Sequence, residues 1–390
     1  MSKTKKIAIV ANSTWNIYNF RLSLIQRLTK EGYRVIVIAP VDEYIHYLND
    51  IYFVKHIDLK QLKAQSKNPF KDVSLTLELY RIFRQEKPDL ILNYTVKPNI
   101  YGNLAAKWLN IPTISTLTGL GYTFLHGKTL KSFIKILYKW SLSYPAKVIF
   151  HNSDDLNLFR QINLLKKDNG EVIFGSGVNT THFSPDTKKE SSKFIFLFVG
   201  RILVYKGIGE YIEAVRKIQK VTGNAQFWVV GELDENKSAS FSKDEFQRAL
   251  EDHTIRYFGT VKDIRPYISQ ADVFVLPSYR EGMPRAVLEA MAMGKPIITT
   301  KVAGCRETVV EGENGFLIPH KDAISLAEAL LKMYHLEKKE LDKMGEKSRQ
   351  LVLNKFDEQL IINRYLKLIQ TILDPNSNHH QKSKTSSAIF

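Results

Sequence analysis

Two glutamates, Glu281 and Glu289, stand eight positions apart in a segment whose pattern is strand, turn and helix. The apolar run over residues 271–276 predicts a buried strand before the turn. Pro284 is accepted in the first turn of a helix, and Gly294 is a good helix stop. Unpaired N–H groups at a helix N-terminus favour an anion, and a carboxylate two turns further on can reach vicinal hydroxyls. The segment therefore suits a sugar that is joined to a nucleoside by a diphosphate.

Two cations follow another apolar run. Residues 194–199 predict a strand, and Arg201 and Lys206 come between its end and the next predicted helix. Because the carboxyl ends of parallel strands face the crevice where ligands bind, these two side chains would clamp the phosphates of a nucleotide. Breaking a sugar–phosphate bond leaves negative charge on the diphosphate, which the cations and the amides near Gly282 and Met283 would stabilise. The alternative is a pair of solvated cations on a loop.

The two segments together resemble the donor-site signature of glycosyltransferase family 4, in which seven residues separate two glutamates. A lone pair of glutamates at this spacing is uninformative, but further blocks follow in the family's order over roughly 120 residues. The resemblance covers about residues 7–373 and is strongest over 194–319. The matching blocks are Val199-Gly200-Arg201, Lys206-Gly207, the Glu281 to Glu289 segment, Gly294-Lys295-Pro296, Gly304-Cys305-Arg306-Glu307 and Asn314-Gly315-Phe316-Leu317-Ile318-Pro319.

The resemblance implies an α/β protein of the GT-B fold, with two Rossmann-like domains facing each other across a cleft. It implies a retaining transfer from a UDP-sugar, by front-face attack because no carboxylate is an obvious covalent nucleophile. Glu281 would contact hydroxyls of the transferred sugar, Glu289 the ribose, and backbone groups near Val261 the uracil. Arg201, Lys206 and Glu281 are then the expected catalytic residues, and no cofactor is expected beside the UDP-sugar, which is a substrate.

Matches to the family are looser in the first half of the chain. Many members carry a histidine in the loop that here begins at Thr118, whereas the next histidine of this chain is His126. No catalytic histidine is therefore assigned. Motifs around Arg21 and Lys97 recur in members that extend lipid-linked bacterial glycans, although both residues could be ordinary surface cations. The acceptor-side candidates are Asn19, Arg21, Lys97, Thr118 and Gly119.

Strand-like and helix-like segments alternate along the chain, which is typical of parallel sheets wrapped by helices. Helices are expected, for example, over residues 17–31, 73–85 and 99–109. The expected strands of the first half are 7–11, 34–39, 89–94, 113–116 and 147–151. Those of the second half are 194–199, 226–230, 255–258, 273–276, 296–299 and 315–318.

The segment over residues 175–185 is rich in glycine, serine and proline and predicts a domain boundary. We expect an acceptor-side domain over residues 1–180 and a nucleotide-sugar domain over 190–355. By resemblance, a helix over 356–373 returns to the first domain. The polar tail over 374–390 is expected to be disordered.

Charge is distributed unevenly in this basic chain. The net charge is +16, and residues 1–190 carry 27 Lys and Arg against 15 Asp and Glu. A basic half predicts an acidic partner, which can be nucleic acid, anionic lipid or a phosphorylated substrate. No helix-turn-helix, zinc-finger or RRM signature supports nucleic acid, and neither a dinucleotide fingerprint nor a P-loop is present.

Metal and secretion signals are also absent from the sequence. Cys305 is the single cysteine, and no zinc-ligand spacing or Asp-x-Asp pair occurs, so no metal is expected. No apolar run has the 18 residues of a membrane span, and the first apolar run is too short for a signal peptide. We therefore expect a cytoplasmic protein.

A basic stripe lies on the predicted helix after residue 127. Four lysines fall on one face, and an apolar set falls opposite. The helix either covers a core with a solvated stripe or lies near anionic lipid headgroups. The lysines are Lys128, Lys131, Lys135 and Lys139, and the apolar set is Phe133, Leu137, Trp140 and Tyr144.

The leading hypothesis is a metal-independent, retaining glycosyltransferase at the inner face of the cytoplasmic membrane. It would move a hexose or an N-acetylhexosamine from a UDP-sugar to a saccharide on a polyprenyl diphosphate, in the synthesis of a cell-surface or protein-linked glycan. A soluble acceptor is the first alternative, and a nucleic-acid-binding protein is a distant one.

Overall fold

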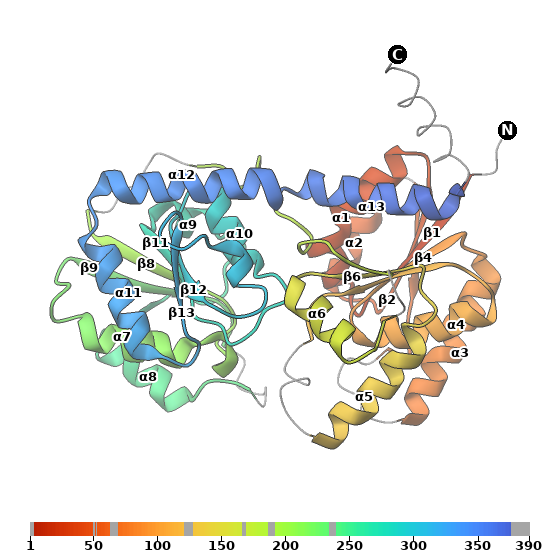
Figure 1. Ribbon diagram of the computed structural model, residues 1–390, viewed down its shortest axis with the longest axis horizontal. Coiled ribbons are helices and arrows are strands. Elements are labelled where there is room, and N and C mark those ends of the chain that lie inside the picture. The colour runs from red at the N-terminus through yellow and green to blue at the C-terminus, as the bar shows by residue number, and fades with distance from the viewer. Residues whose placement is uncertain are drawn as a thin grey trace, which may run out of the picture. The chain divides into compact units, whose positions relative to one another are not determined.

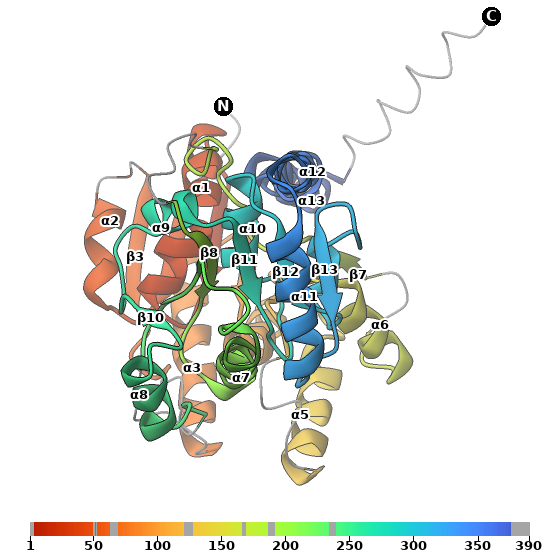
Figure 2. The same cartoon turned by 90° about the vertical axis from the view of Figure 1, so that its left-hand side faces the viewer.

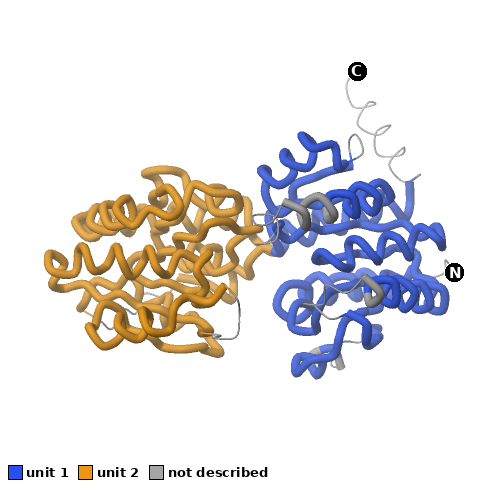
Figure 3. Tube along the Cα trace, turned by 90° about the horizontal axis from the view of Figure 1, so that it is seen from below, with its two compact units in different colours: residues 1–176, 359–390 blue, residues 177–358 orange. Residues whose placement is uncertain are grey.

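The chain folds into two compact units, and the computed structural model describes residues 4–49, 51, 53–62, 69–120, 128–165, 169–185, 192–233 and 239–375. The first unit comprises residues 1–176 and 359–390, and the second comprises residues 177–358 (Figure 3). Each unit is built on a parallel sheet covered by helices (Figure 1).

Seven parallel strands form the sheet of the first unit, in the order β3-β2-β1-β4-β5-β6-β7. The central strands are buried at almost every position because helices cover both faces of the sheet. In register, Ile9 of β1 lies opposite Val37 of β2 and Leu92 of β4. The strands are β1 (Lys6–Val10), β2 (Arg34–Ala39), β3 (Val54–Asp58), β4 (Leu90–Tyr94), β5 (Thr113–Leu117), β6 (Lys147–Phe150) and β7 (Gly170–Val172).

Helices cover the two faces of this sheet with two separate apolar clusters. One cluster joins the sheet to α3, α4, α5 and α6, and the other joins it to α1, α2 and α13. The last helix, α13, therefore belongs to the core of the first unit, where Tyr365 and Ile369 are buried. The helices are α1 (Thr14–Lys30), α2 (His46–Asn49), α3 (Pro69–Glu86), the π-helical turn η2 (Pro98–Gly102), α4 (Asn103–Trp108), α5 (Lys128–Ser141), α6 (Ser153–Gln161) and α13 (Glu358–Leu373).

Six parallel strands form the sheet of the second unit, in the order β10-β9-β8-β11-β12-β13. They are β8 (Phe194–Val199), β9 (Ala225–Val230), β10 (Arg256–Tyr257), β11 (Val273–Leu276), β12 (Ile297–Thr300) and β13 (Gly315–Ile318). Helix α7 packs against α11, and α10 packs against α12 (Figure 2). The helical segments are η4 (Val204–Lys206), α7 (Ile208–Ile218), α8 (Lys243–Glu251), α9 (Arg265–Gln270), α10 (Arg285–Ala292), η5 (Arg306–Thr308), α11 (Ala323–His335) and α12 (Lys338–Lys355).

All eleven strands expected from the sequence form, with ends that differ by at most one residue. β3 and β7 were not expected from the sequence. β3 contains polar residues that are exposed or half-exposed, and β7 is only three residues long. Helix α1 begins at Thr14 rather than at residue 17, since the Ser13 side chain accepts a hydrogen bond from the Asn16 N–H and caps it. The segment expected as one helix over 99–109 begins as a π-helical turn.

The unit boundaries fall at residues 176/177 and 358/359, the first of them inside the segment rich in turn residues. Of the expected disordered tail, residues 376–390 lie outside the described part of the chain. Among the described helices, none combines the length and apolarity needed to span a bilayer.

Candidate active site

The second unit changes the direction of its strand order between β8 and β11. These two strands are neighbours, while β9 and β10 extend the sheet on one side and β12 and β13 on the other. In open α/β sheets, ligands bind outside the carboxyl ends of the strands at such a switch point. The loop after β8 carries Arg201 and Lys206, and the loop after β11 carries Glu281. The topology therefore brings together residues that are about 75 positions apart in sequence.

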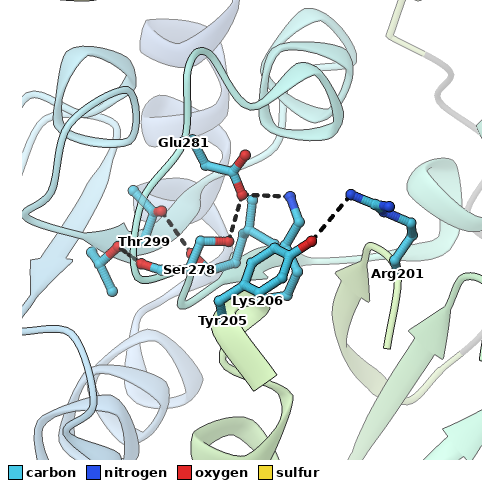
Figure 4. Close-up of polar contacts among 8 residues, drawn as sticks. Arg201, Tyr205, Lys206, Ser278, Glu281 and Thr299 are labelled. Carbon is cyan, nitrogen blue, oxygen red and sulfur yellow. Dashed lines mark hydrogen bonds and ion pairs between the residues drawn. The ribbon is translucent and has the colours of Figure 1, made fainter. Parts of the chain in front are cut away.

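An ion pair joins these two loops. The Lys206 Nζ lies 2.5 Å from Glu281 Oε1, and the Ser278 hydroxyl donates to the same oxygen at 2.7 Å (Figure 4). Both charged side chains are largely buried, with exposed fractions of 17% and 13%. The second Glu281 oxygen is at the opposite end of the carboxylate from Ser278 in the view of Figure 4. The pair fixes an ammonium and a carboxylate at the mouth of the switch point.

The backbone around this pair leaves no room for larger residues. Gly207 adopts φ +76°, and a Cβ built there would lie 2.1 Å from the Pro277 carbonyl oxygen. A Cβ on Gly304, at φ +81°, would lie 2.5 Å from the carbonyl oxygen of Glu281. Glycine is therefore required at both positions, because it alone combines positive φ with this close approach. The two glycines let the loops after β8 and β12 approach the Glu281 loop.

Arg201 lies in the same loop as Lys206 but has a different partner. Its guanidinium donates to the Tyr205 hydroxyl at 3.2 Å (Figure 4). The side chain is exposed. Among the contacts described, Arg201 and Lys206 do not share a partner. The two cations thus stand on one loop with separate neighbours.

Glu289 is held on α10, one helical turn after Arg285. Arg285 Nε donates to Glu289 Oε1 at 2.9 Å, and the exposed fraction of the Glu289 side chain is 14%. Burial raises the pKa of Glu289, and the Arg285 charge opposes that rise. The contacts described for Glu289 are separate from the Lys206–Glu281 pair. The four residues named from the sequence therefore form one ion pair and two separately anchored side chains.

The expected helix start is displaced in the structure. Pro284 is the N-cap residue of α10, and the helix begins at Arg285. Gly282 and Met283 therefore lie in the preceding loop, because Pro284 has extended backbone angles rather than helical ones. Val261 is half-buried in the loop after β10, which is the edge strand on the β8 side of the sheet.

The first unit has its own switch point, between β1 and β4. Arg21 of α1 is 3% exposed, and its guanidinium lies over the ring of Tyr94, 3.9 Å from the ring centre. The alternative of an ordinary surface cation is therefore wrong for Arg21. Its Nε has no hydrogen-bond partner among the described residues. A buried guanidinium with an unused donor is costly unless a ligand or water satisfies it.

The other acceptor-side candidates are dispersed around this edge. Lys97 forms an ion pair with Asp72 at 3.0 Å, and Asn19 donates to the Trp15 carbonyl at 3.0 Å. Thr118 and Gly119 are half-buried and directly follow β5. Gly119 adopts φ +123°, a conformation that favours glycine. His126 lies outside the described residues.

His151 is a buried residue of this edge that the sequence analysis did not single out. It directly follows β6, is 6% exposed, and its Nε2 has no partner among the described residues. Burial and the positive charge of Arg21 lower the pKa of His151 to about 3. Its position after an apolar strand was the available sequence signal, but the sequence could not show its burial beside Arg21.

Keeping His151 neutral makes stability depend on pH. The unfolded chain takes up a proton on this ring below about pH 6.5, whereas the folded chain does so only near pH 3. The contribution of His151 to the free energy of unfolding is therefore fully present above pH 6.5 and is lost as the pH falls toward 3. We expect this group to lower the free energy of unfolding by up to about 1.4 kcal/mol per pH unit in that window. Urea unfolding at pH 7, 6 and 5 measures the slope.

The matched variants are His151→Asn and, on the surface, His335→Asn, since His335 is exposed. The first should flatten the dependence of stability on pH and the second should leave it unchanged. Equal slopes in the two variants would contradict the assignment.

Helix α5 presents a mixed surface. Lys135 and Lys139 are half-exposed and exposed, while Tyr138 is buried in the core. In the interpretation of α5 as a helix that covers a core, Trp140 would face inward, but Trp140 is 68% exposed, and Ile136 beside it is 56% exposed. Leu137 and Tyr144 are partly buried against the core, and Tyr144 lies beyond the helix end. The side chains of Lys128, Lys131 and Phe133 lie outside the described part of the chain.

The two parallel-sheet α/β units define a fold of the GT-B class. A sucrose-phosphate synthase from Thermosynechococcus elongatus aligns with a TM-score of 0.80 and 21% identity, over 95% of this chain and 100% of that one. A glycosyltransferase from Rickettsia africae aligns with a TM-score of 0.76 and 22% identity, over 95% and 99% of the two chains.

Family comparison places the chain within this class. The family model described as glycosyl transferases group 1 matches residues 179–351, and that described as glycosyl transferase 4-like matches residues 6–152. The chain belongs to this family of glycosyltransferases. It is 31% identical to the N,N'-diacetylbacillosaminyl-diphospho-undecaprenol alpha-1,3-N-acetylgalactosaminyltransferase of Campylobacter jejuni, over 94% of this chain and 99% of the relative. It is 27% identical to the UDP-Gal:alpha-D-GlcNAc-diphosphoundecaprenol alpha-1,3-galactosyltransferase of Escherichia coli, over 86% and 87%.

Proposed function

We propose that this glycosyltransferase moves a hexose or an N-acetylhexosamine from a UDP-sugar to a saccharide carried on a polyprenyl diphosphate, with retention and without a metal. The observation that carries the proposal is the Lys206–Glu281 pair at the switch point of the second unit. The printed names of two relatives support the acceptor, since both act on saccharides linked to undecaprenol through a diphosphate. The name of one of them supports a UDP-sugar donor.

Lys206 and Arg201 have the chemistry to stabilise the leaving group. As the bond between the anomeric carbon and the diphosphate oxygen breaks, negative charge grows on the diphosphate, and fixed cations lower the energy of that state. Glu281 accepts hydrogen bonds from hydroxyls of the transferred sugar, and the amides of Gly282 and Met283 complete the phosphate site. The position of these residues in the loops after β8 and β11 supports these roles.

Retention without a covalent intermediate requires that the acceptor approaches on the face from which the diphosphate departs. The acceptor hydroxyl oxygen bonds to the anomeric carbon, and its proton passes to the departing diphosphate oxygen, so that atoms and charge balance. On the acceptor side, Arg21 carries an unused buried donor, and Thr118 and Gly119 stand at the carboxyl end of β5. Glu289 and Val261 would hold the ribose and the uracil.

A thermal-shift screen of nucleotides and nucleotide sugars, with and without EDTA, tests the donor and the metal together. UDP and one UDP-sugar should raise the melting temperature, by the same amount with EDTA, because a ligand of the native state stabilises by mass action. NMR of the product should then show an α-linkage from an α-donor. A shift abolished by EDTA, or an inverted linkage, would contradict the proposal, and turnover of free saccharides alone would favour a soluble acceptor.

The protein is further proposed to lie at the inner face of the cytoplasmic membrane through α5. Lys135 and Lys139 share an exposed face with Ile136 and Trp140, and tryptophan and lysine are typical of membrane interfaces. Lys128 and Lys131 would extend the basic stripe. Each lysine near an anionic surface contributes about 1 kcal/mol, so Lys135→Glu with Lys139→Glu should weaken sedimentation with anionic vesicles at least tenfold. Replacing Lys339 and Lys343 of α12 in the same way is the control, and equal losses would refute the assignment.

A further inference from the structure

An apolar groove opens in the first unit, lined by residues of α3, η2, α4 and α5. Its volume is about 320 Å³, near the lower end of the range of ligand pockets, about 300–1,000 Å³. The walls are almost entirely hydrocarbon, formed by Val73, Leu77, Tyr101, Leu104, Trp108 and Leu137. None of these residues belongs to the donor site or to the acceptor-side candidates.

Three of the wall residues expose much of their side chains. Val73, Leu77 and Trp108 are 60%, 42% and 59% exposed. Exposing large apolar side chains together forgoes the stabilisation that burial would give, and a patch of this kind marks a binding surface. Trp108 is held in place by an edge contact with Tyr80 of α3, whose ring centre is 5.9 Å away. The wall is therefore formed before any ligand arrives.

One end of the groove is polar. Asp72 accepts a hydrogen bond from the Tyr101 hydroxyl at 2.7 Å and forms an ion pair with Lys97 at 3.0 Å. Lys97 stands three residues after the end of β4, beside the switch point of the first unit. The groove thus joins an ion pair next to the expected acceptor side with exposed hydrocarbon. An amphiphile with an anionic head and a branched hydrocarbon tail matches this change from charged to apolar.

We propose that the groove binds the isoprenoid segment next to the diphosphate of the acceptor lipid. This inference rests on the proposed polyprenyl diphosphate acceptor and adds where its hydrocarbon is held. The charge around the groove is compatible with this occupant, since Lys97 offsets the charge of Asp72, and Lys135 and Lys139 add two positive charges on the neighbouring helix α5. A peptide would need partners for its backbone polar groups, and Asp72 is the one charged residue of the lining described. The groove therefore suits a hydrocarbon chain.

Acceptor chain length gives a sharp test. The variant Leu77→Gln makes the wall polar at a side chain that is already 42% exposed, so folding should be preserved. A methylene-sized change in an apolar pocket alters kcat/KM about 10–200-fold. We expect at least about a tenfold loss of kcat/KM with a long polyprenyl acceptor. An acceptor that carries the same saccharide diphosphate on a single isoprene unit should be used equally well by both proteins.

The matched control is Leu353→Gln, on α12 of the second unit, where the leucine is 43% exposed. It should leave both acceptors unaffected. Equal losses of Leu77→Gln with short and long acceptors, or no loss with either, would overturn the proposal. Weaker sedimentation of Leu77→Gln with vesicles that lack acceptor would instead make the groove a membrane-insertion surface, which also overturns it.

A binding measurement separates this inference from the proposed function. Without any UDP-sugar, geranylgeranyl diphosphate should bind more tightly than inorganic diphosphate and change the emission of Trp108, which lines the groove. Leu77→Gln should reduce the ratio of these two affinities at least about tenfold. If wild-type protein transfers only to free saccharides but still shows the preference, the proposed acceptor fails and the groove stands. If it uses polyprenyl acceptors but does not prefer geranylgeranyl diphosphate over inorganic diphosphate, the groove proposal is refuted and the proposed function is not.

Discussion

Replacing Lys206 by alanine is expected to lower kcat by about 10²–10³-fold, the cost of removing one fixed donor from a developing negative charge. The ammonium is 17% exposed and is held 2.5 Å from Glu281, so water cannot replace it at the same place without reordering the site. The loss should appear mainly in kcat, because the interaction strengthens as charge moves onto the diphosphate. Steady-state UDP release at saturating donor measures it.

The control is Lys217→Ala, which removes an exposed lysine of α7 whose partner is Glu213, 3.4 Å away. This variant should keep wild-type rates, since exposed pairs contribute little. Arg201→Ala should have a smaller effect than Lys206→Ala, because Arg201 is exposed and contacts Tyr205 rather than Glu281. If Lys206→Ala turned over at the wild-type rate, Lys206 would have no role in stabilising the leaving diphosphate.

Replacing Gly207 by alanine is expected to have the largest effect on stability. The residue has φ +76°, which costs roughly 1–2 kcal/mol for an L-residue. Its new Cβ would lie 2.1 Å from the Pro277 carbonyl oxygen, so the backbone must move. We expect a loss of about 3 kcal/mol or more in the free energy of unfolding, from strain and overpacking together. Thermal or urea unfolding measures the loss.

Gly223→Ala is the matched substitution, since no atom lies within 4 Å of a Cβ built there and its φ is not positive. It should leave stability almost unchanged. The same Gly207 variant should also lose activity, because Lys206 is the preceding residue and its position relative to Glu281 would shift. A Gly207→Ala protein as stable as Gly223→Ala would contradict this account of the turn.

Much of the fold is predictable because the central strands are continuous apolar runs. Residues 194–199 and 273–276 are buried on both faces of the sheet, so their sequences contain almost no polar residue. β3 is half-exposed at the sheet edge and carries Lys55 and His56, so its pattern resembles a loop. Local composition therefore identifies the buried strands and misses the two edge strands of the first unit, β3 and β7.

Residue types and their loops could be predicted for the site, but their partners could not. Position after an apolar strand predicted that Lys206 and Glu281 face a ligand, and the structure places their loops at the switch between β8 and β11. The sequence did not show that these two pair while Arg201 and Glu289 bind Tyr205 and Arg285. It also did not show the burial of Arg21, or that Trp140 points outward.

The sequence alone determined the alternation of strands and helices, the two units and the chemical groups at the strand ends, because these depend on short-range patterns of apolar residues and turns. Only the tertiary structure decided which of those groups meet, and that the apolar groove beside Trp108 stays open. Such contacts depend on strand order and helix packing, which join residues that are distant along the chain. A local pattern of side chains does not specify contacts between residues that are distant along the chain.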